Sequence, residues 1–404
     1  MCEKKNILIV SAVFPPEQVV SARISKDIAE ALATNHCVVV ICPEPSRPFG
    51  FKFKDTNVEY KFLVKRLKTY LNASSGLLGR IRESYSFGKA SAKYIRNNKH
   101  KIKLIYVNTW PILAQLATIR AARSQRIPVV THVQDVYPES LITKFPILTE
   151  LLMLLLLPVD RLIFQKSTKI IAISEGMKYY LANTRKLSLE NIAVIYNWQD
   201  ENEYISINPE DIPFETDLFT FMYLGNIGPV AGIDFLIDSF IDADLDDAQL
   251  IIAGSGSKKV MLQNYVLKQN KSNILFVDVP EGRVADFQSK ADVMLLPLKS
   301  GVASSSIPSK LPSYMLSKKP IIASVDANSD TARIIKESNS GWFIPAEDRN
   351  KMKIAMQSAI KTDREELSVK GYYGYNYALL NLSKNKNLQK VCYTLENCLL
   401  KPDY

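Results

Sequence analysis

Two series of short, β-rich apolar runs divide the chain, and helix-like patterns separate the runs in each series. The first series comprises residues 6–14, 37–43, 103–108, 128–135, 169–174 and 192–197. The second comprises residues 219–226, 248–254, 273–278, 293–298 and 320–325. Strands that alternate with helices build βα units around a parallel sheet. The pattern therefore predicts an α/β protein with two Rossmann-like, doubly wound domains that face a cleft.

The length of the chain agrees with two domains. A domain has roughly 100–200 residues, and this chain has 404. The polar stretch 198–217 contains Pro209 and Pro213, has no periodicity, and is interpreted as the linker. The predicted domains are therefore 1–200 and 213–362. They are followed by a helical tail, 363–404, that can pack back across the first domain.

Charge is distributed unevenly between the two halves. Residues 1–200 hold 29 Lys and Arg against 15 Asp and Glu, a net charge of +14, and the remainder holds 22 against 26, a net charge of −4. The densest basic stretch is 80–103. A basic half beside a mildly acidic half favours an anionic partner for one face. Nucleic acid is not expected, because no aromatic-studded basic platform or reader motif is present.

The cysteines and histidines argue against a disulfide framework and a metal centre. The five cysteines form no CxxC pair, and the three histidines form no HExxH motif. We therefore expect a reducing, cytosolic compartment. The apolar run at 7–13 is followed directly by FPPE, which predicts a first strand rather than a signal peptide.

The stretch SSSIPSKLPSYM at 304–315 places a single cation between two prolines at a predicted helix start. Ser309 is a suitable N-cap, and Pro312 is tolerated in the first helical turn. Backbone N–H groups at a helix start attract anions, and Lys310 adds a full positive charge. A surface lysine beside a capped helix is the alternative. We interpret this turn as a phosphate site formed by Ser305, Ser306, Ser309 and Lys310.

Two glycine-containing turns follow the first two predicted strands of the second domain. They contain Gly225, Asn226, Gly228, Gly254 and Gly256. Such turns let backbone N–H groups approach a phosphate. Asp278 ends the next strand, as in a dinucleotide fingerprint, but Lys259 stands where that motif has its third glycine. An NAD-binding dehydrogenase, or glycines needed only for tight turns, are the alternatives.

The order and spacing of these runs resemble glycosyltransferase family 4, which has the GT-B fold. LGNIGPVAGIDFLIDSF, LIIAGSGSKK, NILFVDV and ADVMLLPLKSG…IPSKLPSYMLSKKPIIAS are similar to the donor half of that family. FPPEQVVSAR, HVQDVYPESL, IIAISEGM and IAVIYN are similar to its acceptor half. The resemblance covers nearly the whole chain. It implies a retaining transferase that binds a nucleotide-diphosphate sugar in the second domain and uses no metal ion or other cofactor.

The chain departs from the family pattern where many members have an Arg, a Lys and two glutamates around the donor. The corresponding residues here are Asn226, Ala231, Ser305 and Ser313. A branch of the family that acts on bacterial lipid-linked sugars, with PSKL-type motifs, is similarly variable. The resemblance then implies that Lys310, backbone N–H groups and Arg283 or Lys299 neutralise the diphosphate. A catalytically degenerate binding subunit is the alternative.

Two stretches of the first half contain candidate acceptor-side residues. FPPEQVVSAR at 14–23 contains Glu17 and Arg23, which either face a ligand or are ordinary surface charges. THVQDVYPES at 131–140 follows a buried strand and contains His132, Asp135 and Glu139. A carboxylate there can orient an acceptor hydroxyl or take its proton. We expect Asp135 and His132 to face the acceptor and the transferring sugar, with helix capping and a structural histidine as alternatives.

The segment 144–166 contains six leucines and one methionine in succession at 151–157. A helix over 147–157 would be about 17 Å long, too short for a hydrocarbon core of about 30 Å. It can instead lie in the surface of a bilayer, and the basic stretch 80–103 would attract anionic head groups. We expect peripheral attachment to the cytoplasmic face of the plasma membrane. A fully buried helix and a solvated basic face are the alternatives.

These inferences combine into one expected function. The protein would move a hexosyl or N-acetylaminosugar unit from a UDP-sugar to a polyprenyl-diphosphate-linked saccharide. This transfer belongs to surface polysaccharide biosynthesis, of capsule or O-antigen. UDP follows from the family branch, and no residue excludes GDP. A UDP-sugar epimerase of the same fold, which would release free UDP-sugar, is the nearest enzymatic alternative.

Overall fold

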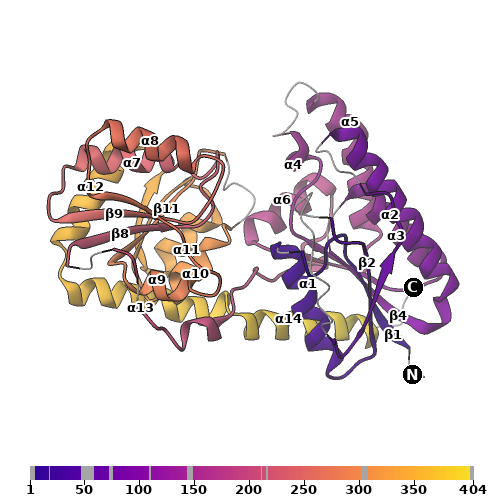
Figure 1. Ribbon diagram of the computed structural model, residues 1–404. Coiled ribbons are helices and arrows are strands. Elements are labelled where there is room, and N and C mark those ends of the chain that lie inside the picture. Colours follow the sequence, from indigo (N-terminus) through magenta and orange to yellow (C-terminus); the bar gives the residue numbers. More distant parts are fainter. Residues whose placement is uncertain are drawn as a thin grey trace. The chain divides into compact units, whose positions relative to one another are not determined.

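The computed structural model describes residues 5–17, 19–46, 59–71, 76–108, 111–142, 149–210, 212–214, 217–301 and 307–400. The chain forms two compact units, Met1–Ile195 with Leu388–Tyr404, and Tyr196–Asn387. Each unit has one parallel sheet with helices on both faces (Figure 1). The predicted pair of Rossmann-like, doubly wound domains is confirmed.

The first unit contains a sheet of order β3-β2-β1-β4-β5-β6-β7. Its strands are β1 (Asn6–Val10), β2 (Val38–Pro43), β3 (Leu63–Leu67), β4 (Ile102–Asn108), β5 (Val129–Val133), β6 (Lys169–Ala172) and β7 (Ile192–Val194). The strand order reverses direction between β1 and β4, which pair in parallel. Open α/β sheets bind ligands at such a switch point, outside the carboxyl ends of the strands.

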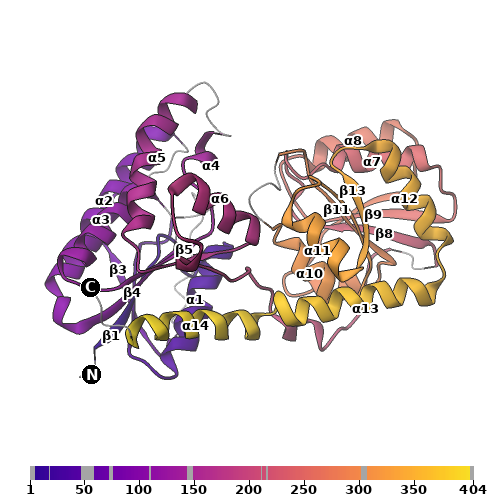
Figure 2. The same ribbon diagram turned by 180° about the vertical axis from the view of Figure 1, so that it is seen from behind.

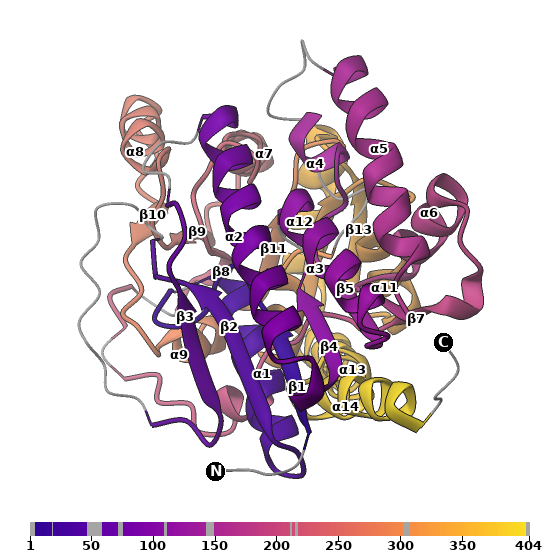
Figure 3. The ribbon, with the colours of Figure 1, turned by 90° about the vertical axis from the view of Figure 1, so that its right-hand side faces the viewer.

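Helices cover both faces of this first sheet. α2 (Leu77–Asn97), α3 (Ile112–Ser124) and α5 (Thr149–Gln165) lie side by side over one face (Figure 3). α1 (Val20–Ala33) lies on the other face (Figure 1). The shorter helices α4 (Glu139–Ile142) and α6 (Glu175–Arg185) flank α5. The C-terminal helix α14 (Lys384–Leu400) contributes residues from Leu388 onward to this unit.

The strands of the first unit follow the rule for parallel sheets. The central strands are nearly continuous runs of buried β-branched residues, because helices cover both of their faces. β3 is different: it lies at the sheet edge, contains Lys65 and Arg66, and is partly exposed. The sequence analysis missed β3 because its charged residues break the apolar pattern on which strand prediction depends.

The second unit repeats this arrangement with a sheet of order β10-β9-β8-β11-β12-β13. The strands are β8 (Phe219–Leu224), β9 (Ala248–Ala253), β10 (Ile274–Val277), β11 (Val293–Pro297), β12 (Ile321–Val325) and β13 (Gly341–Pro345). α7 (Ile233–Ala243), α8 (Lys259–Lys268) and α12 (Arg349–Lys361) cover one face. α9 (Val284–Ser289), α10 (Lys310–Leu316), α11 (Asp330–Ser338) and α13 (Arg364–Asn381) cover the other (Figures 1 and 2).

Side-chain alternation along β8 divides the interior of this unit into two cores. Phe221 and Tyr223 pack into the core under α7, α8 and α12. Met222 and Leu224 pack into the core under α9, α10, α11 and α13. Successive side chains of a strand point to opposite faces, so a sheet with helices on both sides requires apolar residues at every position.

Three further observations concern the earlier expectations. Cys42, Cys392 and Cys398 carry free thiols, whereas Cys37 is disulfide-bonded, a bond that the argument against a disulfide framework did not foresee. Among the described residues, no helix is long and apolar enough to cross a membrane. The same residues contain no group of three or more His, Cys, Asp and Glu side chains that could hold a metal ion.

Candidate functional site

The two glycine-containing turns of the second unit lie directly against each other at the carboxyl ends of β8 and β9. The N–H of Gly225 donates to the carbonyl of Ala253 (2.9 Å), and that of Ile227 donates to the carbonyl of Ser255 (2.8 Å). Gly254 has a φ of +126°, and a Cβ there would lie 2.3 Å from the Gly225 carbonyl oxygen. Only glycine fits this contact without strain.

Lys310 lies on the first of these turns, although 85 residues separate it from Gly225 in the sequence. A Cβ at Gly225 would lie 2.1 Å from Cε of Lys310 and 3.3 Å from its Nζ. Gly225 is therefore needed so that the lysine side chain can lie flat on the backbone. The structure thus brings together Lys310, Gly225, Gly254 and Gly256, as the sequence analysis expected.

Two tyrosines that the sequence analysis did not single out hold Lys310 in place. The hydroxyl of Tyr314 accepts from the Leu224 N–H (2.9 Å) and donates to the Leu224 carbonyl (2.8 Å), which fixes α10 to the end of β8. Lys310 and Tyr314 are four residues apart and so share one helix face. The ammonium of Lys310 lies 5.3 Å from the centre of the Tyr223 ring, within cation–π range.

The charge of Lys310 is poorly solvated in this position. Burial lowers the pKa of Lys310 from its ordinary value. No carboxylate of the described residues forms an ion pair with it, and the tyrosine ring compensates only in part, by roughly 0.5–2 kcal/mol. A cation that is partly removed from water and has no anionic partner is positioned to bind an external anion.

A second charged cluster, also missed by the sequence analysis, lies at the same edge of the sheet. Asp234, in the first turn of α7, lies 3.4 Å from Nζ of Lys299 and 3.7 Å from Nζ of Lys258. Partial burial opposes its ionisation, but the Phe235 N–H and the two lysines hold the pKa of Asp234 below its ordinary value. Lys299, one of the expected diphosphate contacts, is thus already paired with this carboxylate.

Other predicted donor contacts of the second unit have protein partners. The guanidinium of Arg283 bonds Asp286 (2.8 Å) and the carbonyls of Asn208 and Glu210. The hydroxyl of Ser313 is buried between Tyr204 (2.6 Å) and Gln288 (2.8 Å). The expectation that Ser313 contacts the donor is therefore corrected, because its hydroxyl is buried and bonded on both sides. Arg283 holds neighbouring segments together, and its contact with the donor stays a prediction.

The remaining donor-side predictions have mixed outcomes. Asp278 is exposed and pairs with Lys259 (2.6 Å), which also donates to the Gly254 carbonyl. Ser309 precedes α10, but its side chain makes no capping hydrogen bond, so that part of the prediction is wrong. Asn226 is exposed beside Gly228. Ser305 and Ser306 lie outside the described residues.

In the first unit, His132 is entirely buried. Its Nδ1 is bonded to the Tyr106 hydroxyl (2.7 Å) and its Nε2 to the Gln134 side chain (3.1 Å). Burial lowers the pKa of His132 to about 3, so the ring is neutral at physiological pH. The expectation that His132 faces a bound acceptor is corrected: this ring is a structural group of the core.

Asp135 is exposed immediately beyond β5, as its place in the sequence predicted. Arg23 is exposed on α1. Glu17, in contrast, is buried, and its carboxylate accepts from the backbone N–H groups of Phe14 (3.2 Å) and Ser46 (3.1 Å). The expectation of a ligand-facing Glu17 is therefore corrected, because this carboxylate joins two loops.

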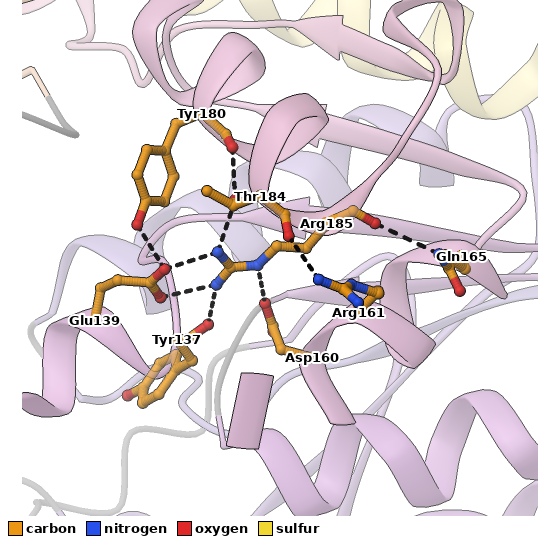
Figure 4. A network of polar contacts seen from close by, with 8 residues as sticks. All are labelled: Tyr137, Glu139, Asp160, Arg161, Gln165, Tyr180, Thr184 and Arg185. Atoms are coloured by element: carbon orange, nitrogen blue, oxygen red, sulfur yellow. Dashed lines mark hydrogen bonds and ion pairs between the residues drawn. The ribbon is translucent and has the colours of Figure 1, made fainter. Parts of the chain in front are cut away.

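Glu139 belongs to a network around the buried cation Arg185, shown in Figure 4. Arg185 donates to Asp160 (2.8 Å), to both carboxylate oxygens of Glu139 (2.7 and 2.8 Å) and to the carbonyl of Tyr137. Tyr180 donates to Glu139 (2.7 Å). Against a contribution from burial, these partners lower the pKa of Glu139. The network joins α4, α5 and α6, so the expected ligand contact of Glu139 is replaced by a structural one.

Comparison with solved structures places the fold in a known class. HepE from Anabaena, crystallised in complex with UDP, shares 16% identity over 97% of this chain and 100% of its own, with a TM-score of 0.71. WaaG, a glycosyltransferase involved in lipopolysaccharide biosynthesis, shares 14% identity over 96% and 99%, with a TM-score of 0.66. The two units, each with one parallel sheet, therefore have the architecture of the GT-B fold.

The sequence comparisons identify the family. Residues 21–203 match the family model described as Glycosyltransferase Family 4, and residues 219–362 match that of Glycosyl transferases group 1. The chain therefore belongs to the glycosyltransferases that these two models describe. It is 24% identical over 226 residues to the probable glycosyltransferase WbjE of Pseudomonas aeruginosa, a match that covers 54% of this chain. The chain thus spans about half the length of that relative (56%).

The buried histidine generates a prediction for acid stability. The pKa of His132 is lowered from its ordinary value of 6.5 to about 3. The unfolded chain therefore binds a proton between these pH values that the folded chain does not. We expect the free energy of unfolding to fall as pH drops below about 6.5, by up to about 1.4 kcal/mol per pH unit from this residue. Urea unfolding of wild type and of His132→Asn from pH 7 to 4 measures the difference.

The exposed His100 supplies a matched control for that experiment. His100→Asn removes an imidazole that is open to solvent and leaves the interior unchanged. We expect its unfolding to keep the pH slope of wild type, whereas His132→Asn should have a shallower slope. Equal slopes for all three proteins would contradict a neutral, buried His132.

The Arg185 network generates a second prediction. Arg185→Met leaves the carboxylates of Asp160 and Glu139 without their shared cation, and removal of one partner from a buried ion pair costs about 3–5 kcal/mol. We expect a loss of that size in the free energy of unfolding. Arg349→Met, whose arginine is half exposed beside Asp242, should cost less than about 1 kcal/mol. If Arg185→Met does not fold, Glu139→Gln should show a smaller loss in the free energy of unfolding. No loss in either variant would refute the structural role of the Arg185 network.

Proposed function

We propose that this chain is an active, retaining glycosyltransferase. Its donor would be a UDP-sugar, and its acceptor a polyprenyl-diphosphate-linked saccharide. The product would be an intermediate of a surface polysaccharide such as capsule or O-antigen. Family membership supports sugar transfer. HepE, a structural neighbour bound to UDP, supports the donor class, and WaaG supports a role in surface saccharide assembly.

The observation that carries the proposal is the placement of Lys310 on the glycine turns of the second unit. Gly225 and Gly254 let two backbone turns meet at the carboxyl ends of β8 and β9. The ammonium of Lys310 lies on that surface, partly buried and with no carboxylate partner among the described residues. A diphosphate is the anion that fits, because it supplies the missing negative charge and accepts hydrogen bonds from nearby backbone N–H groups.

The same geometry suggests how the transfer would proceed. The bond between the anomeric carbon and the diphosphate oxygen breaks, and the acceptor hydroxyl oxygen bonds to that carbon. Its proton passes to the departing phosphate, and Lys310 stabilises the developing negative charge. Asp135, exposed beyond β5, would orient the acceptor hydroxyl. We further propose that no metal ion or other cofactor takes part, so transfer should persist in EDTA.

Attachment to the cytoplasmic face of the membrane is part of the proposal. α2 and α5 each follow a strand of a parallel sheet and so begin at its carboxyl edge. Exposed apolar side chains lie in the N-terminal half of each helix: Leu78, Ile81, Tyr85, Leu151, Leu154 and Leu155. The alternative of a fully buried leucine segment is wrong, because Leu154 is 73% exposed. Arg80 and Arg82 lie among them and would meet anionic head groups.

Lys310 provides the decisive test of donor binding. We expect Lys310→Ala to weaken UDP binding about 10- to 100-fold, because a charge-assisted contact contributes about 1.5–3 kcal/mol. Titration calorimetry with UDP, GDP and NAD measures this loss and the nucleotide preference. Lys319→Ala is the matched control, since burial also lowers the pKa of Lys319 in the same unit, away from the turns. Unchanged UDP affinity in Lys310→Ala would refute the site.

The depressed pKa of Lys310 adds a pH signature to this test. The ammonium binds diphosphate only while it is protonated. UDP affinity should therefore fall as pH rises through a value below the ordinary lysine pKa of 10.5. Lys310→Arg, whose guanidinium stays charged, should flatten this alkaline decline.

Transfer of labelled sugar to extracted lipid-linked acceptor, rather than release of free UDP-sugar, would separate a transferase from an epimerase.

The exposed leucines of α5 provide the test of membrane contact. Burying one leucine side chain contributes about 1.5–3 kcal/mol. We therefore expect Leu154→Ser/Leu155→Ser to reduce co-sedimentation with vesicles of anionic phospholipid at least about tenfold. Leu267→Ser/Leu380→Ser, which changes two leucines of the second unit that are 72% and 64% exposed, should bind like wild type. Equal binding by both variants would rule out α5 as the contact.

A further inference from the structure

A second cationic site lies at the opposite edge of the first sheet, where β4 and β5 begin. A cavity of about 470 Å³ opens there between the short 3₁₀ helix η1 (Lys99–Lys101), the start of β4 and the segment that follows α3. We call it the edge cavity. The basic residues that line it are Lys5, Lys99, His100, Lys103 and Arg126, and no carboxylate belongs to its lining.

The edge cavity is built on an apolar floor with polar groups at its side. Ile102 and Ile127 are almost fully buried, at 3% and 5% exposure, and form the base with Pro128. Ser124 and Gln125 add a hydroxyl and an amide, which are bonded to each other (3.0 Å). Arg126 has a φ of +55°, so the chain turns sharply after α3 and places its side chain at the cavity.

Several of the cations that line the edge cavity have no carboxylate partner among the described residues. Lys103 is held by His36 (3.1 Å), which also contacts Glu396 on α14 (3.0 Å). For Lys5, Lys99 and Arg126, no carboxylate in the described part of the chain lies within ion-pair distance. In the second unit, by contrast, Lys271 and Arg349 are paired with aspartates.

The neighbouring surface extends this positive region. The three segments that lead from helix to strand here, 96–103, 120–128 and 165–169, contain no Asp or Glu. A second cavity of about 300 Å³ lies between α3 and α5. Its lining combines Arg120, Arg123 and Lys166 with Leu116, Ile119 and Leu162. This lining adds three cations to the positive surface, which favours an anionic partner.

We propose that the edge cavity binds a phosphate-bearing molecule at a site separate from the donor site. Lysine and arginine recognise phosphoryl oxygens by charge-assisted hydrogen bonds, and the volume exceeds that of a single phosphate ion. The donor site lies in the other unit, and Asp135 lies beyond the far end of β5. A ligand in the edge cavity would therefore regulate or anchor the enzyme rather than react. The phosphate would come from a soluble metabolite or from the head group of an anionic lipid.

The first arm of the test uses inorganic pyrophosphate as the probe. Calorimetric titration is performed on the full chain with UDP at saturation, so that the donor site is occupied. We expect a binding event in wild type that weakens about tenfold or more in Lys99→Gln/Arg126→Asn. Asparagine is chosen at 126 because it tolerates the left-handed backbone. Lys268→Gln/Lys361→Gln, which removes two exposed cations from the second unit, should bind like wild type.

The second arm uses vesicles of anionic phospholipid and the same two double variants. Weaker pyrophosphate binding by the cavity variant supports a soluble ligand, and weaker binding only to vesicles supports a lipid head group. No difference between the variants in either arm overturns the proposal. Repeating the first arm in Lys310→Ala separates this site from the proposed donor site: pyrophosphate binding that persists there cannot depend on Lys310.

Discussion

The contact between Lys310 and Gly225 is the interaction on which the proposed donor site of the second unit depends. A lysine side chain lies flat on a turn that has no Cβ, and the turn rests on a second glycine turn. Both features cost free energy: the glycines lose more conformational entropy on folding, and the Lys310 ammonium loses part of its hydration. Such costs are concentrated where structure serves binding rather than stability. The Tyr314 hydroxyl, which bonds both backbone groups of Leu224, keeps the arrangement rigid.

Arg185 is fully buried and Lys310 is partly buried, and the surroundings of these two cations suggest a structural role for the first and a binding role for the second. Arg185 is fully buried, but Asp160 and Glu139 neutralise it, and its remaining donors reach hydroxyl and carbonyl oxygens. Burial raises the pKa of Asp160, and the adjacent Arg185 guanidinium opposes that rise. Lys310 has no such carboxylates among the described residues. Burial alone therefore does not indicate function; burial without compensation does.

The sequence predicted what depends on local pattern, and it failed where distant side chains decide. Buried β-branched runs located nearly all the strands, and glycines after strands located the turns. His132 and Glu17 were predicted to face ligands because they stand at or just after strand ends, and Ser313 because it stands where the resembled family has a donor-contacting glutamate. Their partners, Tyr106, Tyr204 and the Ser46 N–H, lie 26 or more residues away, and no local pattern reveals them. The four-residue spacing of Lys310 and Tyr314 was the one feature of the sequence that could have indicated how α10 is fixed to the end of β8.

The two edges of the first sheet have different chemistry for a reason that follows from its topology. In a parallel sheet, all strands end at one edge and all helices end at the other. Helix C-termini carry partial negative charge, so basic residues in the last turns of α2 and α3 are favourable, as Arg96 and Arg123 show. The helix dipole thus accounts for one basic residue at the end of each helix, Arg96 in α2 and Arg123 in α3. It does not explain the additional Lys5, Lys99 and Arg126 around one cavity, where each added cation repels the others. A bound anion would offset that repulsion. The partial negative charge of the helix ends alone does not account for these additional cations.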